Sequence, residues 1–160
     1  MAQVFPGRYT AKTDATFVVF LIGMRVNHVW KPGKWIPVAR AMPPMIEELK
    51  RHPELDFLHS EFLLYWRGVA VLQYWRSFEA LHAFAHMKEG PHLPAWAEFN
   101  RCVGNNGAVG IWHETSQVQP GQSEAIHVNM PRWGLMNAIE PVPVAGRLES
   151  AKGRMGRAEQ

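Results

Sequence analysis

The chain has 160 residues and a mass of 18.2 kDa, which is the size of a single ordinary domain. Hydrophobic residues make up 47% of the sequence and charged residues 19%, a composition that excludes a disordered protein. The formal net charge is +3 and no Lys/Arg cluster is interleaved with aromatic residues, which argues against nucleic-acid binding.

Cys102 is the sole cysteine, so no internal disulfide can form and a reducing compartment is expected. Residues 1–10 lack the basic start and the apolar run of a signal peptide. The longest apolar stretch, residues 17–24, is far shorter than the roughly 20 residues needed to span a bilayer. These features predict a cytoplasmic protein without a membrane partner.

The first predicted element is a strand over residues 15–26, which are β-rich and apolar on both faces. A helix over residues 35–49 follows, because apolar residues recur there at steps of three and four. Pro43 and Pro44 should bend or interrupt this helix.

Two further strands are predicted at residues 57–66 and 69–75. Ser77 is a good N-cap for the next helix, which Gly90-Pro91 ends. Pro94 is suited to the first turn of another helix.

The last predicted strands cover residues 108–115 and 124–130. We expect an extension at residues 1–14, an α+β domain at residues 15–140 and a flexible basic tail at residues 141–160.

This order of elements predicts a ferredoxin-like α+β fold, the split βαβ arrangement with an antiparallel sheet and one additional strand. Its helices can cover only one face of the sheet, while the strands are apolar on both sides. We therefore expect a homodimer that buries the second face.

The sequence contains no phosphate-binding Gly-rich loop, no cysteine pair at metal spacing and no nucleophile elbow. His82 and His86 lie four residues apart on a predicted helix and could share a metal ion, but no third ligand is marked. A polar helix flank is the simpler interpretation.

Aromatic residues gather where the strands meet the helices. Trp75 ends a strand, and His92 precedes a helix on which Trp96 and Phe99 should point inward. An imidazole in this position can be a general base or an axial haem ligand. A helix cap beside core aromatics is the structural alternative.

Polar side chains also alternate with apolar ones along the strands. Trp112 and Glu114 share one face of their strand while His113 takes the other. Two more pairs share a face: Arg25 with Asn27, and His127 with Asn129. Such groups need partners when buried, so they indicate either a ligand site or a hydrogen-bond network at the dimer interface.

The stretches GMRVN, KWIPVARAM, QYWRSFEAL, HLPAWAEFNR, GIWHET and VNMPRWGL together resemble a bacterial and fungal family with an uncharacterised, monooxygenase-like domain. The resemblance runs from about Thr16 to Met136. It implies membership of the dimeric α+β barrel superfamily, which includes cofactor-free antibiotic-biosynthesis monooxygenases, haem-degrading monooxygenases and haem-dependent aldoxime dehydratases.

Cofactor-free members surround an aromatic substrate with Trp, Asn and Arg and let it react directly with O2. The resemblance then implies His92 or His113 as the base, with Arg25 and Asn27 as donors to the developing oxyanion. Substrate contacts would come from Trp75, Trp96, Trp112, Phe99, His127 and Asn129.

Haem-degrading members use an Asn of the first strand, a Trp at a strand end and a helix His as axial ligand. Asn27, Trp75 and either His92 or His86 match that pattern. Three hypotheses stay open: a monooxygenase for an apolar or aromatic small molecule, a haem enzyme, and a non-catalytic dimer that binds a small apolar ligand.

Overall fold

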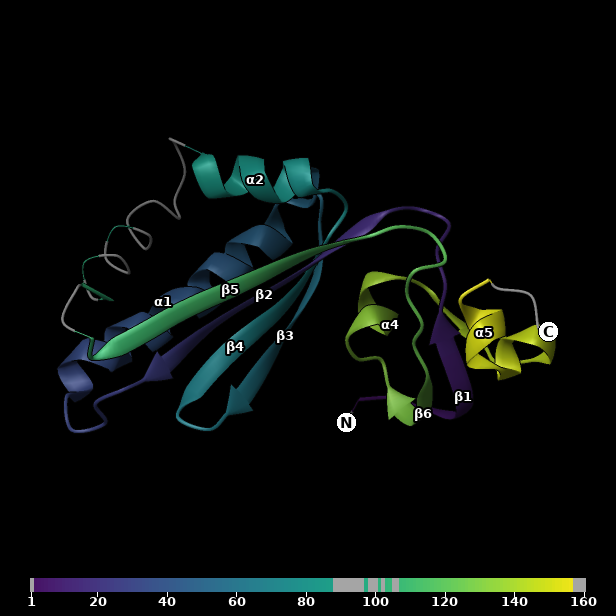
Figure 1. Cartoon of the computed structure of the whole chain (residues 1–160), viewed down its shortest axis with the longest axis horizontal. Coiled ribbons are helices and arrows are strands. Elements are labelled where there is room, and N and C mark those ends of the chain that lie inside the picture. Colours follow the sequence, from purple (N-terminus) through teal and green to yellow (C-terminus); the bar gives the residue numbers. More distant parts are fainter. Residues whose placement is uncertain (1, 88–96, 98–100, 102, 105–106, 157–160) are drawn as a thin grey trace.

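The computed structural model describes residues 2–87, 97, 101, 103–104 and 107–156. Two groups of elements lie side by side in Figure 1. One is a four-stranded sheet with helices α1 and α2, and the other is a three-stranded sheet with the short helices α4 and α5.

The four-stranded sheet has the order β3-β4-β2-β5, and all its neighbours are antiparallel. Its strands are β2 (Phe17–Val26), β3 (Phe57–Tyr65), β4 (Gly68–Trp75) and β5 (Val109–Val118). The apolar β2 lies inside the sheet and pairs along most of its length with β4 and β5. This arrangement confirms the predicted ferredoxin-like α+β fold.

Helix α1 (Pro32–Arg51) begins with a proline in its first turn and is followed by the short 3-10 helix η1 (Pro53–Leu55). It continues through Pro43 and Pro44, so the predicted interruption at this point is wrong. The buried stripe stays in phase on both sides of the prolines, and its packing outweighs the lost backbone hydrogen bonds. The stripe consists of Val38, Met45, Ile46 and Leu49.

Helix α2 (Phe78–His86) starts as the sequence predicts. Ser77 has extended backbone angles, and its Oγ accepts a hydrogen bond of 3.1 Å from the Ala80 N–H. This contact satisfies one of the backbone donors that a helix leaves free at its N-terminus. The helix predicted to begin near Pro94 lies outside the described residues.

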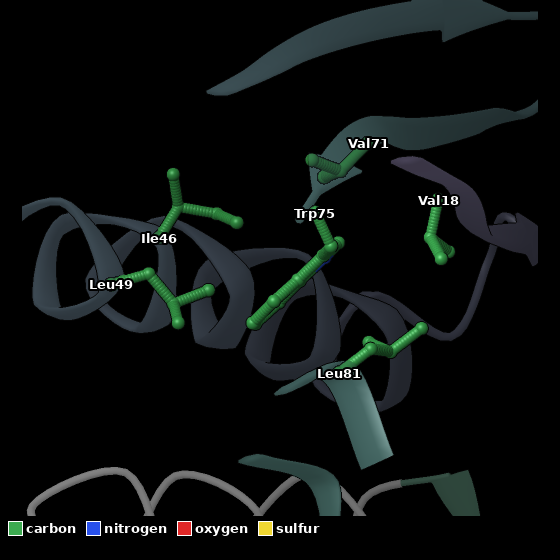
Figure 2. Close-up of a cluster of buried hydrophobic side chains, with 6 residues drawn as sticks. All are labelled: Val18, Ile46, Leu49, Val71, Trp75 and Leu81. Atoms are coloured by element: carbon green, nitrogen blue, oxygen red, sulfur yellow. The ribbon is translucent and has the colours of Figure 1, made fainter. Parts of the chain in front are cut away.

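Both helices pack on the same face of the four-stranded sheet, around the indole of Trp75. Figure 2 shows this side chain among Ile46 and Leu49 of α1 and Leu81 of α2. Trp75 is fully buried, and the edge of the Phe57 ring meets it at 5.2 Å between centroids. The core of the sheet–helix layer is therefore built around this residue.

The second sheet has the order β6-β1-β7, from strands β1 (Val4–Ala11), β6 (His127–Pro131) and β7 (Pro141–Pro143). The helices beside it are α4 (Leu135–Ala138), η2 (Gly146–Glu149) and α5 (Ala151–Arg154). Residues expected to form an extension and a flexible tail thus carry regular structure. An ion pair between Arg154 and Glu124 holds α5 in place.

Candidate functional site

A cavity of about 280 Å³ lies between the four-stranded sheet and the two helices. Its volume is near the lower end of the range for small-molecule sites. Most of its wall is apolar, contributed by Phe20, Ile22, Trp75, Met42, Met45, Ile46, Leu49, Phe78, Leu81, Phe84 and Ala85. A second apolar cavity of about 220 Å³ continues along α1 and shares Ile22 and Met42 with the first.

The inner end of the larger cavity is formed by Trp75 and Gln73 of β4. Gln73 is 4% exposed, and its Oε1 accepts a hydrogen bond of 2.9 Å from the indole Nε1–H of Trp75. Gln73 was missed by the sequence analysis. The sequence feature that could have identified it is a polar residue on the same strand face as Val71 and Trp75, which are both buried.

The outer end carries the polar residues His82 and His86 of α2 and His113 and Thr115 of β5, all exposed. The rings of His82 and His86 stack at 4.0 Å, and the His113 ring lies 5.6 Å from that of Phe20. Within the described ranges no group of three metal-ligating side chains occurs. The cavity therefore runs from a buried amide to a mouth lined by imidazoles.

Arg25 and Asn27 lie away from this cavity. The Arg25 guanidinium donates to Asn27 Oδ1 at 2.9 Å, and Asn27 Nδ2 donates to the Gly107 carbonyl at 3.0 Å. Both ends of the Asn27 amide are thus engaged in holding the end of β2 against the start of β5. Arg67 completes this cluster through hydrogen bonds to the backbone carbonyls of Val26 and Asn27.

Trp112 lies on the opposite face of the sheet from the helices. Its indole covers Gly23 so closely that a Cβ atom there would lie 2.7 Å from the ring. The Trp112 Nε1–H donates to the Tyr65 hydroxyl at 2.9 Å, and this hydroxyl donates to the Met24 carbonyl at 2.7 Å. Trp112 is thus part of the open face and not of the cavity wall.

His127 and Asn129 belong to β6 in the other sheet. Asn129 has a positive φ of 52°, and its Oδ1 accepts a hydrogen bond of 2.8 Å from the Gly7 N–H. Burial lowers the pKa of His127, although a hydrogen bond with the Trp133 backbone opposes the shift. The structure thus brings Trp75, His113 and the alternative haem ligand His86 of the predicted site to one cavity. The remaining predicted residues, His92, Trp96 and Phe99, lie outside the described part of the chain.

The fold and the cavity define an α+β protein with a ferredoxin-like sheet and an apolar chamber under its helices. The model of the family described as "Monooxygenase af470-like" matches residues 17–135, which include the whole cavity. The chain belongs to this family. None of the helices that the structure describes has the length and apolar character needed to cross a bilayer.

One curated relative is monooxygenase af470 of Aspergillus fumigatus, which is 30% identical over 152 residues. The match covers 81% of this chain and 53% of that protein, so the chain spans about half of its relative's length. Two crystal structures of aldoxime dehydratases share the fold, one of them in complex with butyraldoxime. Their TM-scores are 0.66 and 0.63 at 13% and 17% identity, and both matches cover 86% of this chain and 44% of the dehydratase.

Proposed function

We propose that the protein is a small-molecule monooxygenase that binds an apolar or aromatic substrate in the cavity under α1 and α2. The observation that carries the proposal is the apolar chamber itself, which lies within the residues that match the monooxygenase family. It is closed by Trp75 and open beside His113, so a substrate would have apolar surroundings at the closed end and an imidazole base at the open end.

The proposed chemistry needs no cofactor. His113 removes a proton from a CH2 group that a neighbouring carbonyl or phenol activates, and the resulting carbanion reduces O2. One oxygen atom becomes a new carbonyl group, the other leaves as water, and the substrate supplies all four electrons. The apolar wall surrounds the rest of the substrate, and a hydrogen-bond donor fixed in the cavity would stabilise the developing oxyanion.

Two alanines of α2 allow a direct test of the cavity. Both are exposed, but Ala85 lines the cavity and Ala83 lies outside its wall. With a panel of apolar ketones and phenols in an oxygen electrode, Ala85→Trp should abolish substrate-dependent O2 uptake and Ala83→Trp should retain it. Binding of these ligands to folded wild-type protein without O2 uptake would favour a non-catalytic carrier. Equal O2 uptake by the two variants would place the reaction elsewhere.

Haem is the second candidate, because imidazoles line the cavity mouth and aldoxime dehydratases share the fold. The described cavity wall does not fit haem well, since it contains no Lys or Arg to pair with the two propionates. Titration with haemin tests the point. A Soret band at one haem per subunit, lost in His92→Ala or His86→Ala and kept in His82→Ala, would establish a haem protein and contradict the cofactor-free proposal.

We also propose a homodimer formed through the open face of the four-stranded sheet. Between its helix-facing residues, β2 presents Val19 and Leu21 to this face, and β4 presents Leu72.

A further inference from the structure

Apart from the indole N–H of Trp75, which donates to it, the side-chain amide of Gln73 is the only buried polar side-chain group in the described wall of the larger cavity. We infer that this amide is a ligand-binding donor, and that the cavity takes an apolar molecule carrying one carbonyl, enolate or phenolate oxygen. The inference rests on the proposed function, because it names the substrate class of the same site.

The orientation of the amide follows from its neighbour. An indole N–H can only donate a hydrogen bond, so the atom that faces Trp75 at 2.9 Å must be the amide oxygen of Gln73. Trp75 is fully buried and is held by the rings of Phe57 and Phe84, which keeps the contact in place. The NH2 group of Gln73 is consequently fixed on the other side of the amide.

This NH2 group has no partner among the described residues. Within the described part of the chain, the Gln73 side chain makes one hydrogen bond, the one that its oxygen accepts. Ser60 lies directly opposite on β3, but its own buried Oγ also lacks a partner. Gln73 Nε2 is not among the fully buried atoms without a partner, so it borders the open space of the cavity, where the oxygen of a ligand would accept its hydrogen bond.

The surroundings decide which acceptor fits. No Asp, Glu, Lys or Arg is among the described residues of the wall, so the site offers a neutral donor in an apolar medium. Such a donor suits a single polarised oxygen, and its hydrogen bond strengthens when negative charge develops on that oxygen. A carboxylate or phosphate ligand would instead bring an uncompensated charge into this region.

The sheet register also sets the size of the ligand. Gln73 on β4 pairs with Phe20 on β2, and one row further along Ile22 pairs with His113 on β5. Gln73 and His113 therefore lie two strands and one row apart on one face, roughly 12 Å between their Cα atoms. A flat molecule of about two fused rings, resting on Phe20 and Ile22, would reach from the amide toward the imidazole.

The test uses 2-acetylnaphthalene and 2-isopropenylnaphthalene, which differ in having C=O or C=CH2 at the same position. Quenching of tryptophan fluorescence should show that wild-type protein binds the ketone at least tenfold more tightly than the alkene. Equal affinities would overturn the inference about Gln73 while leaving the cavity as the substrate site. Failure of folded protein to bind either compound would contradict the proposed site as well.

Two variants remove the donor without adding a charge. Gln73→Met keeps the length of the side chain and removes the amide, and Gln73→Leu replaces it with a shorter apolar side chain. Each should lose the tenfold preference for the ketone and bind the alkene about as well as the wild type does. The infrared C=O stretch of the bound ketone should also shift to lower frequency in the wild type and not in Gln73→Met. A preference or shift that survives in Gln73→Met would assign the donor to another residue.

Discussion

At the scale of the residue, the indole of Trp75 joins the stability of the fold to the shape of its cavity. It is enclosed by both helices and by the sheet (Figure 2). Its N–H also fixes the Gln73 amide. A single side chain thus buries apolar surface in the core and positions a polar group at the closed end of the cavity. The first role affects the stability of the protein, and the second affects ligand binding.

Trp75→Ala should therefore destabilise the protein by about 3–5 kcal/mol, the usual cost of deleting a buried aromatic side chain. Urea denaturation monitored by circular dichroism measures this change. Trp66 provides the matched control, because it is 83% exposed and Trp66→Ala should change stability by only about 0.5 kcal/mol. Similar losses for the two variants would contradict the core described above.

His127 should make the protein less stable in mild acid. Burial lowers its folded-state pKa below the ordinary value of 6.5, so the unfolded chain binds a proton more readily. Stability is then lost as the pH falls from about 6.5 toward the lower folded-state pKa. His127→Leu should reduce this loss in melting temperatures measured between pH 5 and 8.

His52 at the end of α1 serves as a control, because its pKa shifts in the opposite direction to that of His127. A hydrogen bond with Glu54, supported by the charges of Glu54 and Glu48, raises the pKa of His52 above 6.5. Its contribution is present at lower pH and is lost as the pH rises through that raised pKa. If His52→Asn and His127→Leu altered the same pH window, this assignment would be wrong.

The sequence identified part of the cavity. Trp75 and His113 were recognisable because each sits at a strand position where an aromatic or an imidazole is conspicuous. Gln73 was overlooked because a lone amide in an apolar strand has no motif, and its importance depends on the neighbouring indole. Arg25 and Asn27 seemed suited to a substrate, but no pattern in one sequence reveals that they bind each other and the Gly107 carbonyl.

At the scale of the element, α1 shows how packing overrides local propensity. Pro43 and Pro44 lie in its interior, where each removes a backbone hydrogen bond, and still the helix continues to Arg51. The apolar repeat predicted the helix correctly, because burial of a whole stripe outweighs one unfavourable turn. The strands β2 to β4 were equally predictable from their apolar runs. Strand β7 has only three residues, which is too short for an alternating apolar pattern to be recognised.

Pro44→Ala should consequently stabilise the protein. The substitution restores an N–H that can bond to the Arg40 carbonyl and removes the clash of the proline ring, and Pro44 itself is exposed. We expect a gain of about 1–3 kcal/mol in urea denaturation, reduced somewhat by the greater freedom of the unfolded chain. Pro32→Ala in the first turn should bring no gain, because that position needs no N–H donor. A Pro44→Ala protein no more stable than Pro32→Ala would show that α1 carries no such strain.

At the scale of the whole molecule, the four-stranded sheet has one face under helices and one face that the second group of elements covers only in part. Contact between the groups is made where Glu61 of β3 accepts hydrogen bonds from the Gly134 N–H and the Asn137 side chain. The rest of the open face presents Val19, Leu21 and Leu72, together with Trp112. This surface is the basis of the proposed homodimer.

Leu21→Glu should convert that dimer to a monomer, because it places a charge in the middle of the open face. Sedimentation equilibrium at micromolar concentration gives the mass directly. Leu64→Glu is the matched control at an 87% exposed position that faces the helix side, and it should stay dimeric. A wild-type protein that sediments as a stable monomer would exclude the proposed interface.

The central claim is that the cavity under α1 and α2 houses an oxygenation reaction. Incubation with ¹⁸O2 and the substrate that gives the highest O2 uptake, followed by mass spectrometry of the product, tests this claim most directly. We expect one ¹⁸O atom in each product molecule, formed by the wild type and by Ala83→Trp but not by Ala85→Trp. A product that carries no ¹⁸O, or one that Ala85→Trp forms as readily as the wild type, would contradict it.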